Sequence, residues 1–181
     1  MNARQTEWPR EWLMTDERMG EQLWAAIDRL RPSASGIVFR HYSLAPHERE
    51  ALARRVAAIC RERDIILAIA ADAEMATALS AQLVHNPSKL PAGLPFSRSV
   101  HSIAEAEAAR SEAASLVFIS AVYATNSHPG RKPLGPGLAA RIAEAADVPA
   151  IALGGMDAQK FAALPCGAFY GWAGIDAWIR T

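Results

Sequence analysis

The sequence predicts an α/β fold, a single compact (β/α)8 TIM barrel over residues 1–181. Short apolar runs alternate with amphipathic stretches along the chain, which is the pattern of parallel strands joined by crossover helices. Eight such runs are present, the number that closes a barrel. The chain is shorter than the usual lower limit of about 200 residues for this fold, so shortened helices and loops are expected. A flavodoxin-like open sheet is the alternative arrangement.

Each expected strand is a short apolar run bounded by polar or turn-forming residues. The runs cover residues 11–15, 36–40, 65–70, 82–85, 95–99, 116–122, 148–153 and 168–172. Helical patterns occupy residues 19–30, 46–62, 74–80, 103–114, 136–146 and 157–164, with a short closing segment from Ile175. The connection at residues 87–94 lacks helical periodicity, so a loop is expected there.

The composition indicates a protein that binds a small molecule. Lysine plus arginine and aspartate plus glutamate balance at 19 each, which argues against nucleic-acid or membrane-surface binding driven by net charge. Cys60 and Cys166 show neither disulfide nor metal-ligand spacing. The first ten residues lack the apolar centre of a signal peptide, and no run approaches the roughly 18 apolar residues of a membrane span. A cytoplasmic location is therefore expected, and a homodimer is one state that the sequence leaves open.

The apolar run at residues 148–153 ends in Gly154, Gly155 and Met156 at the start of a helical pattern. Glycines let a ligand approach the main chain, and a helix start adds a positive end, so a phosphate could bind the bare amides there. The same two glycines could also form only a tight turn.

Polar residues follow the other expected strands, where barrel enzymes carry their sites. They include Arg40 and His41, Asp72, His85 and Asn86, Ser99, Thr125 to His128, and Gly174. Arg40 is the most informative, because a guanidinium at the end of an apolar strand is costly unless it meets an anion or a carboxylate. Asp16 and Ser102 have a competing interpretation as helix N-caps.

Five segments, in chain order, share a pattern with one known family. They are residues 12–16 (WLMTD), 38–40 (VFR), 99–106 (SVHSIAEA), 122–130 (VYATNSHPG) and 148–156 (VPAIALGGM). Together they resemble the thiamine phosphate synthase and TenI-like family of small (β/α)8 barrels. The match is best from the fifth to the eighth strand and poor at the third and fourth.

The resemblance implies that hydroxymethylpyrimidine diphosphate is joined to a thiazole phosphate, with magnesium pyrophosphate expelled. By position, the residues that would bind the thiazole phosphate are Gly154, Gly155, Gly174 and Ile175. The residues that would surround the pyrimidine and its diphosphate are Arg40, Ser99, Thr125, Ser127 and His128, with Arg40, Ser127 and His128 in the catalytic role. His41 would shape the pyrimidine pocket or lie at the surface, and Asp72 would help to rebuild the diphosphate site.

Several positions depart from the family pattern. The glutamine and lysine that flank the arginine are Val38 and Tyr42 here, and the lysine of the sixth loop is His128. An asparagine-aspartate pair falls on residues 70–71, both alanine, and a second metal aspartate falls on Lys89. Mg2+ would therefore lack at least one carboxylate ligand. The histidine that TenI-like tautomerases use aligns with an alanine, at residue 121.

Two hypotheses follow from this mixture of matches and departures. The first is a working transferase with an altered pyrophosphate site. In this hypothesis the residues that bind and stabilise the pyrophosphate are Arg40, Ser127, His128 and Asp72. The second is a TenI-like protein that binds a thiazole phosphate without catalysis. The group of polar side chains in the sixth loop favours the transferase. A phosphosugar isomerase on the same barrel is a distant third, because no strand end carries a suitable general-base carboxylate with a partner.

Overall fold

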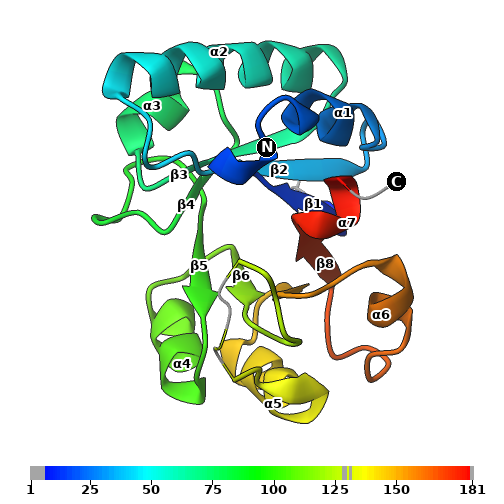
Figure 1. The fold of residues 1–181 in the computed structure, drawn as a ribbon. Coiled ribbons are helices and arrows are strands. Elements are labelled where there is room, and N and C mark those ends of the chain that lie inside the picture. The colour runs from blue at the N-terminus through cyan, green and yellow to red at the C-terminus, as the bar shows by residue number, and fades with distance from the viewer. Residues whose placement is uncertain (1–6, 128–129, 131, 180–181) are drawn as a thin grey trace.

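The computed structural model describes residues 7–127, 130 and 132–179, and these form a closed barrel of eight parallel strands in chain order. The predicted (β/α)8 fold is confirmed. The open sheet is wrong, because the last strand pairs with the first at Gly174 and Leu13. The strands, labelled in Figure 1, are β1 Glu11–Met14, β2 Ser35–Phe39, β3 Ile66–Ala70, β4 Leu83–His85, β5 Phe96–Val100, β6 Leu116–Ile119, β7 Ala150–Leu153 and β8 Gly171–Gly174.

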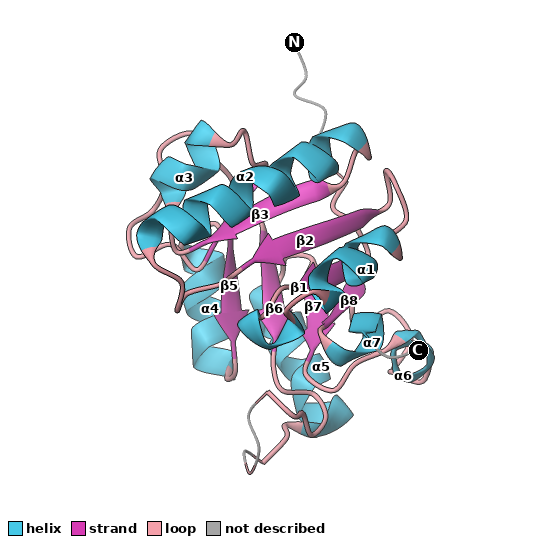
Figure 2. Cartoon of the chain, turned by 45° about the horizontal axis from the view of Figure 1, so that its top comes forward, coloured by secondary structure: helices cyan, strands magenta, loops and turns pink. Residues whose placement is uncertain are grey.

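Helices surround the strands on the outside of the barrel (Figure 2). They are α1 Gln22–Asp28, α2 Pro46–Glu62, α3 Ala73–Ala78, α4 Ile103–Ser111, α5 Gly135–Ala146, α6 Ala158–Ala162 and α7 Asp176–Ile179, with a 3-10 turn at Glu17–Met19. The connection from β4 to β5 has no helix, as predicted. Within the described ranges, every helix is too short or too polar to cross a membrane.

The sequence misplaces the last strand. It predicts residues 168–172, whereas β8 covers Gly171–Gly174. The amide of Ala168 donates to the carbonyl of Pro165 at 3.1 Å, so this part of the apolar run forms a turn, and Phe169 packs into the core from that turn. Gly174 is therefore the last residue of β8, whereas the sequence placed it after the strand.

The interior of the barrel is filled by side chains from most of its strands, among them Trp12 of β1, Leu83 of β4 and Phe118 of β6. Trp12 and Phe118 are fully buried and meet edge to face, with ring centroids 5.5 Å apart. A Cβ atom at Gly36 would lie 2.4 Å from the Trp12 ring, so only glycine fits at this position of β2. A second apolar layer lies between strands and helices and includes Phe39, Val56 and Ile142.

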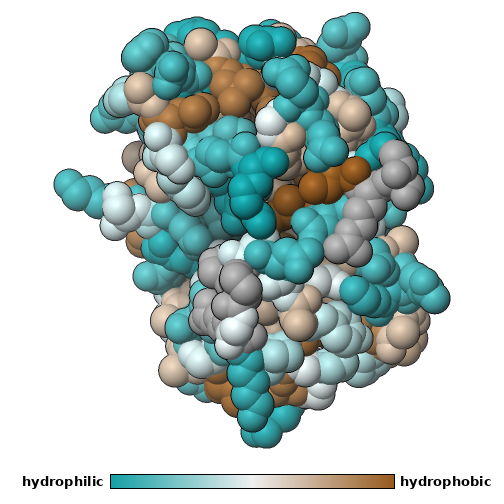
Figure 3. All heavy atoms as spheres, in the orientation of Figure 1, coloured by the Kyte–Doolittle hydropathy of each residue, from teal (hydrophilic) through white to brown (hydrophobic). Residues whose placement is uncertain are grey.

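The C-terminal helix is fixed to the barrel by tryptophan contacts. Trp178 of α7 stacks on Trp172 of β8, with ring centroids 5.2 Å apart, and its indole Nε1 donates to the carbonyl of Trp12 at 3.1 Å. Gly174, Ile175 and the start of α7 are therefore held in one position at the barrel end. Elsewhere, the face drawn in Figure 3 is mainly hydrophilic, with hydrophobic residues in separate patches.

Candidate functional site

A cavity of about 430 Å³, the main cavity, opens at the C-terminal ends of the strands. It is lined by residues from the ends of β1, β2, β4, β5, β6, β7 and β8. The sequence-predicted residues that it brings together are Arg40, Ser99, Thr125, Ser127, Gly154, Gly155, Gly174 and Ile175. His41 and Asp72 lie outside its lining, and His128 lies outside the described residues.

Gly154 and Gly155 are glycine because of packing. Their φ angles are +92° and +62°, which L side chains rarely adopt. A Cβ atom at Gly154 would lie 2.6 Å from the Cβ of Ala121, and one at Gly155 would lie 2.3 Å from the carbonyl oxygen of Ala124. The glycines therefore make a tight turn against the loop after β6 and also border the main cavity, where phosphate binding stays a prediction.

Gly154 and Gly155 line the main cavity, and their amides are not used by the described part of the protein. Among the described residues, neither amide donates to a main-chain or side-chain acceptor. Gly174 lies beside this turn, because a Cβ atom on it would come 3.1 Å from the carbonyl oxygen of Met156. We call the amides of Gly154 and Gly155 the glycine cradle; together with the adjacent end of β8 they suit a phosphate group.

Lys160 adds a positive charge to the glycine cradle, and the sequence interpretation missed it. Its Nζ donates to the carbonyl oxygen of Gly155 at 2.6 Å, and its side chain lines the main cavity. Asp157 caps the short helix α6 by accepting from the amide of Lys160 at 2.8 Å. A basic residue in the first turn after a glycine pair was the signal that could have revealed it, because helix N-termini usually favour acidic residues.

Arg40 faces the main cavity with one free edge. Its Nε donates to the carbonyl of Thr15 at 2.7 Å, and its Nη2 donates to Asp16 at 3.2 Å. Among the described residues Nη1 has no partner, and it is not sealed from solvent. Burial lowers the pKa of Arg40, but arginine remains charged at neutral pH. The Arg40 guanidinium is thus paired with a carboxylate, as the sequence predicted, and it keeps donors for a ligand.

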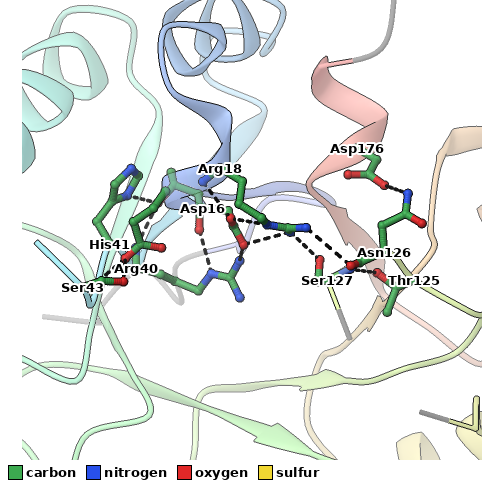
Figure 4. Close-up of polar contacts among 11 residues, drawn as sticks. Asp16, Arg18, Arg40, His41, Ser43, Thr125, Asn126, Ser127 and Asp176 are labelled. Atoms are coloured by element: carbon green, nitrogen blue, oxygen red, sulfur yellow. Dashed lines mark hydrogen bonds and ion pairs between the residues drawn. The ribbon is translucent and has the colours of Figure 1, made fainter. Parts of the chain in front are cut away.

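A chain of polar contacts links Arg40 to Ser127, two residues that line the main cavity, through Asp16 and Arg18, which do not line it (Figure 4). Asp16 accepts from Arg18 Nε at 2.7 Å as well as from Arg40. Arg18 continues to Ser127, donating from Nη2 to Oγ at 3.0 Å, and Asn126 Nδ2 donates to Asp176 at 2.9 Å. The ends of β1, β2, β6 and β8 are thereby joined.

Electrostatics keep the Asp16 carboxylate ionised. Burial raises its pKa, but hydrogen bonds from Arg18 and the charges of Arg18 and Arg40 outweigh that effect and hold the pKa below its usual value. Asp16 also caps the 3-10 turn by accepting from the Arg18 amide at 3.0 Å. The alternative interpretation of Asp16 as an N-cap is therefore confirmed, as is that of Ser102, which caps α4.

A buried histidine lies at the floor of the main cavity beneath Ser99. Asn86 Oδ1 accepts from the Ser99 amide at 2.7 Å, so Nδ2 of Asn86 is a donor, and it lies 3.2 Å from His85 Nε2 and 3.0 Å from Ser99 Oγ. This pattern assigns the ring proton to His85 Nδ1, which donates to Ser97 Oγ at 2.9 Å. Burial lowers the pKa of His85 to about 3, so a neutral network orients the Ser99 hydroxyl.

His41 supports the backbone of Arg40 from outside the cavity. It is 5% exposed and stacks on Phe39, with ring centroids 4.9 Å apart. Thr15 Oγ1 accepts from the amide of Arg40 and lies 3.0 Å from His41 Nδ1. Burial lowers the pKa of His41. The charges of the nearby acids Glu17 and Asp16 act to raise it but do not outweigh burial. The surface alternative for His41 does not fit this burial.

Asp72 belongs to a second cavity, of about 570 Å³, which meets the main cavity at Tyr42. Its Oδ1 accepts from the amide of Met75 at 2.8 Å, and its Oδ2 pairs with Arg49 at 3.2 Å. Lys89 lines the same cavity.

The residues at the ends of β3 and β4 do not fit the Mg2+ that the family resemblance implies. Magnesium prefers carboxylate and phosphate oxygens, whereas the Asp72 carboxylate is already paired with Arg49 and Lys89 brings a further cation. Over the described ranges, no three His, Cys, Asp or Glu side chains come together as a metal site.

Comparison with known proteins identifies the family. A profile of the family described as "Thiamine monophosphate synthase" matches residues 12–177. The chain is 27% identical to "Putative thiamine-phosphate synthase 2" of Aquifex aeolicus (strain VF5) over 185 residues, which cover 96% of this chain and all of that protein.

Solved structures share the fold. Thiamine phosphate pyrophosphorylase from Pyrococcus furiosus superposes with a TM-score of 0.81 at 21% identity, covering 95% of this chain and 88% of that one. FabK from Thermotoga maritima gives 0.72 at 15% identity, covering 94% of this chain and 59% of that one. These likenesses establish the barrel, and the family match extends over nearly the whole chain. The chain belongs to the thiamine monophosphate synthase family.

Proposed function

We propose that this chain is a transferase of thiamine phosphate synthase type, which joins hydroxymethylpyrimidine diphosphate to a thiazole phosphate. One observation carries the proposal: two anion-binding features border the same cavity. The glycine cradle follows β7, and the free edge of Arg40 follows β2. A transferase with two phosphorylated substrates needs two such features, whereas a protein that binds a thiazole phosphate alone needs one.

The cradle and Lys160 would hold the thiazole phosphate, because bare amides and an ammonium group favour a phosphate dianion. Arg40 would bind the diphosphate, and the Ser99 hydroxyl, oriented by Asn86 and His85, would hydrogen-bond the pyrimidine. The thiazole nitrogen then forms the new C–N bond as the C–O bond to the diphosphate breaks, and the bonding electrons leave with pyrophosphate. The protein contributes positioning and stabilisation of the departing charge.

A second candidate is a thiazole-phosphate-binding protein without catalysis. It is favoured by the second cavity, where both oxygens of the Asp72 carboxylate already have partners, Arg49 and the Met75 amide, and are poorly placed to bind a metal. The contact roles of Asp72, His41, Thr125, Ser127 and His128 stay predictions from the resemblance, as do a cytoplasmic location and a homodimer.

A direct assay separates the two candidates. Purified protein is mixed with Mg2+, the pyrimidine diphosphate and the thiazole phosphate, and the product is followed by thiamine-type fluorescence after oxidation. The transferase predicts product that depends on both substrates and is abolished by Arg40→Ala. Arg54→Ala, which changes an exposed ion pair on α2, is the matched control and should keep full activity. Thiazole phosphate binding without any product would select the binding protein.

A further inference from the structure

We infer that Arg18 binds the diphosphate of the incoming substrate and supplies the cation that the family has at the position of His128. The inference rests on the proposed function and extends it to a residue from another strand end. In the family that the sequence resembles, the sixth loop carries a lysine where this chain has His128. The structure brings Arg18 to the residues just before that position, at Ser127 Oγ (3.0 Å) and the carbonyl of Asn126 (3.5 Å).

The geometry pairs Arg18 with Arg40 around one carboxylate. Nη2 of Arg18 lies 3.1 Å from Asp16 Oδ2, and Nη2 of Arg40 lies 3.2 Å from the same oxygen. The two nitrogens are therefore within about 6.3 Å of each other, the most that these two contacts allow. The group of Asp16, Arg18 and Arg40 carries one net positive charge, and its two planar guanidinium groups can each bind phosphate oxygens in pairs.

Arg18 keeps donors for a ligand. Its side chain is 52% exposed, and Asp16 uses only its Nε and Nη2 atoms. Nη1 makes one long contact, the 3.5 Å bond to the Asn126 carbonyl. Arg18 is not itself among the residues that line the main cavity, but Ser127, whose hydroxyl accepts from Nη2, is. An anion that enters between Arg40 and Ser127 can thus replace weak contacts of Arg18 with charge-assisted hydrogen bonds.

A purely structural role would give a different result. If Arg18 only tethered the sixth loop to β1, its loss would affect the whole cavity, including the glycine cradle, whose turn packs against Ala121 and Ala124 of the same loop. If Arg18 binds the diphosphate, its loss affects pyrophosphate and spares phosphate at the cradle.

The test measures binding of inorganic pyrophosphate and inorganic phosphate by calorimetry, in wild type, Arg18→Gln and Arg18→Lys. We expect Arg18→Gln to weaken pyrophosphate binding about tenfold or more, the usual worth of a charge-assisted hydrogen bond, with phosphate binding changed less than about twofold. Arg18→Lys should recover part of the loss. Arg54→Gln, an exposed arginine of α2, is the control and should match wild type.

Three outcomes would overturn the inference: no pyrophosphate binding by wild type, wild-type pyrophosphate binding by Arg18→Gln, or equal loss of both anions. Steady-state kinetics separate it from the proposed function. Arg18→Gln should raise KM for the pyrimidine diphosphate and leave KM for the thiazole phosphate unchanged. Pyrophosphate binding that depends on Arg18, without any product, would contradict the transferase and support the inference. Product formation with unchanged kinetics in Arg18→Gln would support the transferase and contradict the inference.

Discussion

Arg40, which lines the main cavity, forms an ion pair with Asp16, with Nη2 of Arg40 3.2 Å from Oδ2 of Asp16. The same carboxylate pairs with Arg18 at 2.7 Å, so one negative charge is shared by two cations. This arrangement stabilises the mostly buried Arg40 and leaves the group of Asp16, Arg18 and Arg40 with one net positive charge.

Replacing Asp16 by asparagine should lower the stability of the protein and raise its affinity for pyrophosphate. Asn keeps the cap of the 3-10 turn but removes the charge that balances Arg40, so we expect the free energy of unfolding to fall by about 1–2 kcal/mol. Pyrophosphate should bind at least about fivefold more tightly, because the net charge of the group rises. Chemical denaturation and calorimetry measure the two effects. Unchanged or weaker pyrophosphate binding would show that Asp16 does not compete with the ligand.

Loss of Lys160 should weaken phosphate binding at the cradle. Lys160→Gln keeps a donor for the Gly155 carbonyl but removes the charge, and we expect inorganic phosphate to bind about fivefold to tenfold more weakly, with a smaller dependence on salt. Arg141→Gln on the exposed face of α5 is the control for loss of one positive charge. Equal salt dependence in Lys160→Gln and wild type would place the phosphate away from Lys160.

An alanine at Gly155 should damage both fold and site. Its Cβ would meet the Ala124 carbonyl at 2.3 Å, at a φ of +62°, so we expect a loss of about 2–4 kcal/mol in unfolding free energy and of phosphate binding. Gly137→Ala in α5, where a Cβ meets nothing within 4 Å, should be neutral or stabilising. Thermal denaturation compares the two. A stable Gly155→Ala variant that binds phosphate normally would contradict the packing account.

The buried His85 should make stability depend on pH. Its pKa in the folded protein is about 3, well below the usual value of about 6.5 in an unfolded chain. Between these values the unfolded chain binds a proton that the native protein does not, so stability falls as the pH drops from 6.5 towards 3. From pH 6.5 to pH 5 the loss is about 2 kcal/mol.

Urea denaturation at several pH values compares wild type with His85→Gln. The variant should be less stable at neutral pH, because the contacts with Ser97 and Ser99 change, but its stability should depend less on pH in this range. His47→Gln, which removes an exposed histidine, is the control. A variant with the wild-type slope would show that His85 is not the group responsible.

The sequence predicted most of the barrel, because buried parallel strands must be apolar runs and crossover helices must be amphipathic. It missed the position of β8, since Ala168 and Phe169 are as apolar as a strand while they lie in or beside a turn. Apolar character indicates burial but not backbone conformation.

The candidate site was predictable only where its residues follow strands. Arg40, Ser99 and the glycine pair met that rule. Arg18 follows β1 and was still missed, because its side chain reaches across 109 positions of sequence to Ser127, and local pattern gives no indication of such a contact. The separation of Asp72 from the main cavity was equally hidden, since it depends on the direction in which Arg49 of α2 points.

Simultaneous binding of two anions tests the central claim most directly. Calorimetric titration with the thiazole phosphate is performed on free protein and on protein saturated with inorganic pyrophosphate. If the glycine cradle and the arginine side of the cavity are separate, one thiazole phosphate should bind per chain in both titrations, with affinity equal or higher in the second. Competition, seen as a thiazole phosphate affinity that falls in proportion to the pyrophosphate concentration, would mean that the cavity has a single anion site.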